Sequence, residues 1–328
     1  MTAIALPKHG RLGHYLPLLP LGSGGMADVI LASLDGPGGF QKLVVLKCLK
    51  RHLAGDPQLR ETFLTEARLT ARMNHPNVVQ VLEILDVGEA SVMAMEYLEG
   101  ESLATVLAAA PIELPRSLHL YVLSEMLRGL HYFHELQSLD GTPLSPVHRD
   151  VSPHNVFVTQ EGVVKVLDFG IARALEPTDR INTETGIVKG KIHYMAPEQL
   201  AGQPLDRRAD VFAAGIMLWE ALCHRRLWKD MTEMDVMRAL LNGGWPSARE
   251  LAPGLPVELY EAVEGALCLD VRQRLPTAQA LRDLLVRGLS QTGSADGEAL
   301  GLYMQRSFGE HHSAQRRLVA KRLERPPS

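Results

Sequence analysis

The sequence predicts an α+β protein, with strands in the first third of the chain and helices in most of the remainder. Five short apolar runs before residue 98 have the length of strands, and one stretch among them has helical spacing. From Leu103 onward the apolar spacing is helical, apart from a strand–turn–strand pattern at 156–167. The order of elements therefore separates a small β-rich part from a larger helical part.

Composition excludes several classes of protein. The length of 328 residues suggests about two domains. The net charge of −4 argues against a nucleic-acid-binding protein, which would be strongly basic. The three cysteines are far apart and form no CxxC pair, which argues against a zinc site or a disulfide framework and favours a reducing cytoplasm. The chain shows no secretory signal and no apolar run of ~18 residues, so we expect a soluble protein without a transmembrane segment.

The first strand, from His14 to Gly22, enters a glycine-rich loop that also contains Gly24 and Gly25. A strand-like run follows at 29–32, so the loop is expected to turn a β-hairpin rather than open a helix. Glycines let a backbone approach phosphates because no Cβ intervenes. By itself this pattern is weak and favours an ordinary hairpin turn.

The strand at 43–47 ends its apolar run on Lys47. A lysine on an apolar strand has to be paired or to reach solvent. Glu66, in the helical stretch 59–73, is the expected partner. The alternative is a surface pair worth about 0–1 kcal/mol.

Two further strands, at 82–87 and 91–97, complete the β-rich part. A helix that Pro115 can open follows, with one apolar face made by Leu118, Val122, Met126, Leu130 and Phe133. His131 and His134 lie three positions apart on it. No third ligand is near, so we expect a packing or surface role for both and no metal.

The stretch V-H-R-D-V-S-P-H-N at 147–155 carries the central residues of the predicted site. It contains Asp150 and, five residues later, Asn155. A strand pair then leads to Asp168 in D-F-G, 13 residues after Asn155. This arrangement suits the binding of metal ions and phosphates beside a base, and phosphoryl transfer needs mainly positioning and charge neutralisation.

The H-R-D-x-x-x-x-N loop followed by D-F-G resembles the signature of protein kinases. G-S-G-G-M-A-D-V and A-P-E-Q resemble the bacterial, eukaryotic-like (Hanks-type) Ser/Thr protein kinases. The resemblance implies a bilobal fold: a small β-rich first lobe (14–98) with one regulatory helix, and a larger, mostly helical second lobe (99–290). A leader (1–13) precedes this domain and a helical, basic tail (291–328) follows it.

The resemblance also implies ATP and Mg²⁺ as cofactors and assigns roles to residues. Asp150 would accept the proton of the substrate hydroxyl, and Asn155 and Asp168 would hold Mg²⁺. The Lys47–Glu66 pair would anchor the α- and β-phosphates. The remaining nucleotide-binding positions are Gly22, Gly24, Gly25 and Val29 in and after the loop, Met95 behind the adenine, and the backbone of Glu96 and Leu98.

The activation segment runs from Asp168 to Glu198 in the same resemblance. Thr183 and Thr185 match the usual autophosphorylation positions, and a phosphate there would pair with Arg149. The alternative is that both are plain solvated threonines. At the scaffold positions, Asp210 is expected to tether the catalytic loop and Arg274 to pair with Glu198.

Two departures from the family pattern occur together. Ser152 stands where Ser/Thr kinases usually carry a lysine, and Lys191 stands where they usually carry a threonine. In the family fold these positions flank the base. Our hypothesis is that Lys191 supplies the cation that Ser152 cannot.

The expected function is ATP- and Mg-dependent phosphorylation of Ser/Thr hydroxyls of proteins in signalling. Pro153 favours Ser/Thr over tyrosine. Ser152, and Ala27 in place of a third loop glycine, favour the alternative of a nucleotide-binding pseudokinase that acts as a regulatory scaffold. The tail is expected to dock on the second lobe or to bind a partner protein, through an amphipathic face with Leu300, Tyr303, Phe308, Leu318 and Leu323.

Overall fold

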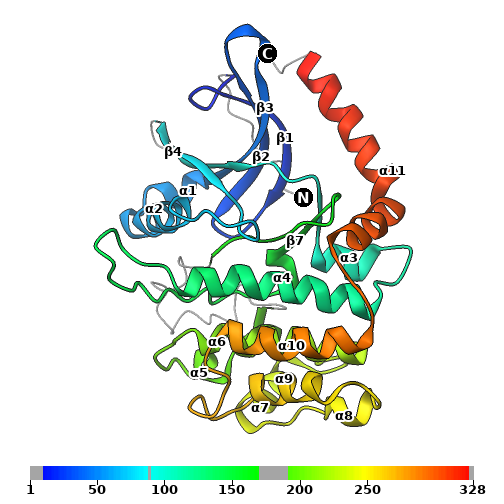
Figure 1. The fold of residues 1–328 in the computed structure, drawn as a ribbon. Coiled ribbons are helices and arrows are strands. Elements are labelled where there is room, and N and C mark those ends of the chain that lie inside the picture. The colour runs from blue at the N-terminus through cyan, green and yellow to red at the C-terminus, as the bar shows by residue number, and fades with distance from the viewer. Residues whose placement is uncertain (1–9, 88–89, 170–190, 325–328) are drawn as a thin grey trace. The chain divides into compact units, whose positions relative to one another are not determined.

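The computed structural model describes residues 10–87, 90–169 and 191–324. The chain forms two compact units. The N-terminal unit consists of Met1–Asn74, Val79–Glu99 and Phe308–Ser328, and the C-terminal unit of His75–Val78 and Gly100–Ser307. Strands dominate the first unit and helices the second (Figure 1).

The N-terminal unit is built on a five-stranded antiparallel sheet in the order β1-β2-β3-β5-β4. Its strands are β1 (Tyr15–Ser23), β2 (Ala27–Asp35), β3 (Gln41–Leu49), β4 (Val81–Val87) and β5 (Ala90–Glu96). All five agree with the predicted strands. One face carries the core residues Tyr15, Ile30, Ala32, Val44, Leu46, Val92 and Ala94.

Helices α1 (Arg51–Ala54) and α2 (Pro57–Ala71) lie between β3 and β4 in the sequence of this unit. Asp56 caps α2 by accepting hydrogen bonds from the backbone N–H groups of Gln58 and Leu59, and Pro57 occupies the first helical position. The buried face of α2 includes Phe63, Glu66 and Ala67. The cap explains why α2 begins at Pro57, and the apolar spacing explains which face of α2 is buried.

The C-terminal unit is mostly helical. Its α-helices are α3 (Leu103–Ala109), α4 (Arg116–His134), α5 (Pro197–Leu200), α6 (Arg208–Cys223), α7 (Glu233–Asn242), α8 (Ala248–Leu251), α9 (Val257–Ala266) and α10 (Ala278–Thr292), followed by α11. Every residue of α6 from Ala209 to Leu222 is buried, as expected of a helix that is apolar all round. Helices α4 and α9 contact α6, and α10 contacts all three (Figure 1).

A three-stranded sheet in the order β6-β7-β8 lies beside the end of the loop at 147–155 in the same unit. Its strands are β6 (Gly100–Ser102), β7 (Val156–Thr159) and β8 (Val164–Val166). Gly162 turns the β7–β8 hairpin at φ +82°, and a Cβ there would meet the carbonyl oxygen of Gly297 at 1.9 Å. Only glycine therefore allows the hairpin to lie against the start of α11.

In the C-terminal tail, α11 (Gly297–Glu324) is one continuous helix that includes the basic residues after Ser313. Its residues up to Ser307 belong to the C-terminal unit, where the Tyr303 hydroxyl donates to the carbonyl of Ile112. Its buried residues include Leu300, Tyr303, Phe308 and Val319. The prediction was wrong for Leu318, which is 47% exposed, because its neighbour Val319 takes the buried position. No helix in the described part of the chain is long and apolar enough to cross a membrane.

Candidate active site

Lys47 and Glu66 form an ion pair inside the N-terminal unit. Lys47 lies on β3, opposite Val29 of β2 and Met93 of β5, and its Nζ is 2.9 Å from Glu66 Oε1 on α2. The two side chains are only 15% and 8% exposed. The predicted contact is therefore present. Its burial distinguishes it from an exposed pair, which solvent would screen.

The glycine-rich loop turns the β1–β2 hairpin, as predicted. The N–H of Gly24 donates to the carbonyl of Ala27 at 2.8 Å, and the Ser23 hydroxyl donates to the Asp28 carboxylate at 2.7 Å. Among the described residues, a Cβ at Gly22 or Gly25 would meet no atom within 4 Å. Packing within the described part of the chain thus does not require glycine at these two positions.

The segment after β5 begins with Met95 and Glu96. Met95 is buried at 9% exposure. The Glu96 backbone N–H donates to Gln80 O, and the Glu96 carboxylate accepts from Gln80 N at 2.8 Å. These two bonds fix the segment that was predicted to hold adenine by its backbone.

In the C-terminal unit, Asn155 joins the catalytic loop to D-F-G. Pro153 opens the short 3₁₀ turn Pro153–Asn155, and Asn155 Nδ2 donates to the Asp150 carbonyl at 2.8 Å. The Asn155 carbonyl accepts from the N–H of Leu167, the residue before Asp168, also at 2.8 Å. Asp150, Asn155 and Asp168 are therefore carried by one hydrogen-bonded frame.

Asp210, in the first turn of α6, holds the backbone just before Asp150. Its carboxylate accepts from the N–H of His148 at 2.7 Å and from that of Arg149 at 2.8 Å. Arg149 has φ +64° and Asp168 has φ +46°, both in the left-handed region that non-glycine residues rarely occupy. The bonds from Asp210 offset the cost of this backbone at Arg149. The predicted tether is confirmed.

His134 is a residue of this centre that the sequence analysis left as packing or surface. Its Nε2 lies 2.7 Å from Asp210 Oδ2, and the two side chains are 0% and 1% exposed. Burial raises the pKa of Asp210, but the hydrogen bonds from the His134 side chain and the His148 N–H bring that pKa below its usual value. The distance from His134 to Asp210 in sequence, 76 residues, hid this contact.

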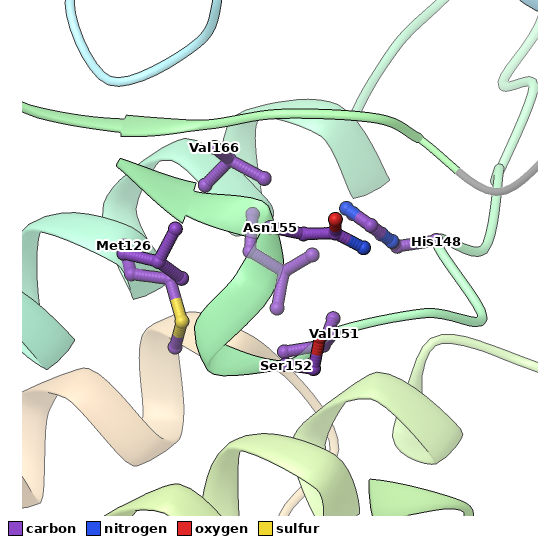
Figure 2. Close-up of a pocket in the computed structure, with 8 residues that line it drawn as sticks. Met126, His148, Val151, Ser152, Asn155 and Val166 are labelled. Atoms are coloured by element: carbon purple, nitrogen blue, oxygen red, sulfur yellow. The ribbon is translucent and has the colours of Figure 1, made fainter. Parts of the chain in front are cut away.

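The aromatic residue of D-F-G is buried beside the catalytic loop. The Phe169 ring lies 4.4 Å from that of Phe133 and 5.0 Å from that of His148. Burial lowers the pKa of His148, so its ring is held neutral, and its Nε2 lies 3.2 Å from the Leu167 carbonyl. Figure 2 shows the His148 ring beside the Asn155 amide, in a narrow hollow that Met126, Val151, Ser152 and Val166 also line.

The end of the activation segment is fastened by two clusters. Arg274 makes hydrogen bonds of 2.6 and 3.1 Å to the two oxygens of Glu198, and both side chains are buried, so the predicted ion pair is present. The Tyr194 hydroxyl donates to Glu220 at 2.8 Å, and burial raises its pKa. Gln199 Nε2 donates to the carbonyl of Arg149 at 3.0 Å, which ties this segment to the catalytic loop.

Three predicted residues are not tested by this geometry. Thr183 and Thr185 lie outside the described residues. Lys191 begins the 3₁₀ turn Lys191–Tyr194, but its side chain is outside the described part. The exchange of roles between Lys191 and Ser152 therefore stays a prediction.

The chain matches the family model of the protein kinase domain over residues 15–286. The chain belongs to the protein kinase family. This kinase is 43% identical over 308 residues to "Tyrosine-protein kinase MasK" of Myxococcus xanthus, an overlap of 93% of this chain and 47% of that protein. It is 31% identical over 271 residues to "Serine/threonine-protein kinase PrkC" of Bacillus subtilis, covering 81% of this chain and 39% of PrkC.

A third relative is "Serine/threonine-protein kinase PknB" of Mycobacterium tuberculosis, 33% identical over 277 residues, with 81% and 41% covered. The kinase thus spans less than half the length of these relatives. A crystal structure of the Mycobacterium tuberculosis PknI kinase domain superposes with a TM-score of 0.62 at 24% identity, covering 88% of this chain and all of that one. The predicted bilobal α+β fold and the recognition of a bacterial, eukaryotic-like kinase are confirmed.

Proposed function

We propose that this kinase transfers the γ-phosphoryl group of ATP, with Mg²⁺, to serine or threonine hydroxyls of protein substrates in signalling. The observation that carries the proposal is the frame formed by Asn155, which bonds to the carbonyl of Asp150 and to the residue before Asp168. A base and two oxygen ligands on one rigid frame are what positioning a phosphate beside a hydroxyl requires.

In this proposal Asp150 accepts the proton of the attacking hydroxyl. Its side chain is partly exposed, so a substrate hydroxyl can reach it. Its position is held from behind, because Asp210 fixes the N–H groups of His148 and Arg149. Preorganisation of this kind costs nothing at the moment of reaction.

The donor set fits Mg²⁺. Asn155 uses its amide nitrogen on the Asp150 carbonyl, which leaves its oxygen as the ligand atom, and the Asp168 carboxylate lies on an exposed residue. Mg²⁺ takes oxygen ligands and usually only one or two carboxylates from protein. Bound there, the ion would neutralise charge on the phosphates.

ATP is proposed to contact the N-terminal unit through the remaining predicted residues. The Lys47 ammonium, oriented by Glu66, would meet the α- and β-phosphates. Packing against the described residues does not require glycine at Gly22 or Gly25, which supports a backbone that lies close to a ligand. The adenine would rest near Met95 on backbone groups of Glu96 and Leu98.

The acceptor is the point on which the relatives divide. PrkC and PknB are named serine/threonine kinases, whereas MasK, the relative with 43% identity, is named a tyrosine kinase. We favour Ser/Thr because of Pro153 in the catalytic loop. Tyrosine is the second candidate, and the test below separates the two.

The test is the intact mass of the purified protein before and after incubation with Mg-ATP, beside an Asp150→Asn variant. Gains in steps of about 80 Da in the wild type alone, at threonine or serine by fragmentation, support the proposal. Modified Thr183 or Thr185 would establish activation-segment autophosphorylation. Phosphotyrosine alone would favour the second candidate.

The pseudokinase alternative has its own outcome in the same experiment. A wild type that gains no mass and phosphorylates no added protein or peptide, yet melts at a higher temperature with ATP, would replace the proposal by a nucleotide-binding scaffold.

We place the kinase in a reducing cytoplasm, in line with the free thiols of Cys48, Cys223 and Cys268.

A further inference from the structure

The second half of α11, from Phe308 to Glu324, belongs to the N-terminal unit. In this half, the buried or half-buried residues Phe308, His312, Gln315, Val319 and Leu323 lie three or four positions apart, as on one face of a helix. In the second half, Val319 is 6% exposed and packs with Leu18 of β1 and Leu31 of β2, which are 0% and 1% exposed. Leu323, one turn later, packs against the same cluster. These residues lie beyond position 286, where the match to the kinase family ends.

The sheet face that this helix covers is the face that carries Lys47. In the β2–β3 ladder Leu31 pairs with Val45, and Val29 pairs with Lys47. Residues two apart on a strand, and residues directly opposite on neighbouring strands, share a face. Leu31 therefore lies beside Val29 on the face proposed to bind the nucleotide.

A second contact reaches the segment proposed to hold adenine. Arg316 Nη1 lies 3.3 Å from Glu99 Oε1, and Tyr97 packs against the Val319 cluster. Tyr97 and Glu99 flank Leu98 in sequence. The helix thus contacts strands β1 and β2 and also the segment that is proposed to hold the adenine.

We propose that Phe308–Glu324 is an intramolecular brace of the nucleotide-binding face, and that its release weakens ATP binding. The apolar contacts of Val319 and Leu323 hold β1 and β2 in place, and the ion pair of Arg316 holds the segment after β5. Without the brace, Leu18 and Leu31 would face water and the strands would lose a packing partner. The inference rests on the proposed use of ATP.

The experiment compares two adjacent substitutions in the full chain, Val319→Asp and Leu318→Asp. Both place a charge on the same helix, but Leu318 is 47% exposed and Val319 is buried. The dissociation constant of Mg-ATP is measured by calorimetry, with circular dichroism as a check of folding. We expect V319D to bind ATP about 5-fold more weakly or worse, and L318D to stay within about twofold of the wild type.

Equal affinities in wild type and V319D would overturn the brace alone, because the wild type would still have bound ATP. A wild type that binds no ATP would overturn the proposed function instead. If V319D fails to fold, variants of the ion pair test the proposal instead. Arg316→Glu should weaken ATP binding, and the double variant E99R/R316E should restore it. Equal ATP affinity in the wild type, R316E and the double variant would overturn the brace.

Discussion

The imidazole of His134 and the carboxylate of Asp210, 2.7 Å apart, fasten both ends of the connection between α4 and the catalytic loop. His134 is the last residue of α4, where the connection begins. The same carboxylate accepts the N–H groups of His148 and Arg149, where it ends. The position of Asp150 is therefore set by these bonds and not by the intervening residues, of which Leu139 is fully exposed.

Replacing His134 should lower both stability and turnover. His134→Leu removes a hydrogen bond to a buried carboxylate, which should cost about 1.5–3 kcal/mol of unfolding free energy. It should also lower kcat more than it raises KM for ATP, since Asp210 positions the base and not the nucleotide. Urea unfolding and steady-state kinetics would measure both effects. His131→Leu, at a partly exposed position on the same helix, is the control; an equal loss of kcat in both variants would contradict the assignment.

The acid sensitivity of the fold should depend on His119. This side chain is buried in α4, and burial, with the charges of His224 and Arg226, lowers its pKa to about 3. The unfolded chain takes up the proton near pH ~6.5 and the folded one only near pH 3, so stability falls as pH drops through this window. The loss should reach about 2 kcal/mol between pH 7.5 and pH 5.

His119→Leu should remove that part of the pH dependence. Denaturant unfolding at pH 7.5, 6 and 5 would show a flatter profile for this variant than for the wild type. His52→Leu, at an exposed histidine, serves as the comparison. A parallel loss in wild type and H119L would show that other groups cause the acid sensitivity.

The Glu198–Arg274 pair should be worth far more than an exposed ion pair. Arg274→Met leaves the buried Glu198 carboxylate without its partner, which should cost about 3–5 kcal/mol. Arg249→Gln breaks a pair with Glu264 in which the side chains are 50% and 59% exposed, and should cost less than about 1 kcal/mol. Unfolding midpoints of the two variants give the comparison. Similar midpoints would mean that the buried pair contributes little.

The Lys47–Glu66 pair should be needed for phosphoryl transfer. Glu66→Gln removes the charge that orients Lys47, and the rate should fall about 10²-fold or more. Glu61→Gln, also on α2, breaks a pair with Arg68 that is about 60% exposed on both sides and should leave the rate within about twofold. Initial rates with a protein substrate measure the effect. An E66Q enzyme as fast as E61Q would rule out this role of the pair.

Lys191→Met tests whether Lys191 replaces the cation missing at Ser152. Loss of a cation that acts on the transferred phosphate should lower kcat about 10²-fold or more with little change in ATP binding. Lys229→Met, an exposed lysine of the same unit, is the control. An unchanged kcat in K191M would rule out the exchange, and calorimetry with ATP would show whether binding had changed.

The order of the elements and most residues of the candidate site could be predicted from the sequence. Five strands, the helix with Glu66 and the loop with Asp150 and Asn155 follow from apolar periodicity and from motifs within a few residues of one another. Such signals are local, because strand and helix spacing repeats every two or about 3.6 residues.

Contacts between segments that are distant in sequence could not be predicted in this way and are known from the fold. His134 contacts Asp210, 76 residues later in the chain, and the residue spacing of neither segment predicts this contact. Leu318 and Val319 are adjacent and both apolar, so the pattern of α11 does not say which of them is buried. The surface that covers the helix makes that choice: Leu18 and Leu31 enclose Val319, and Leu318, about 100° around the helix, faces water.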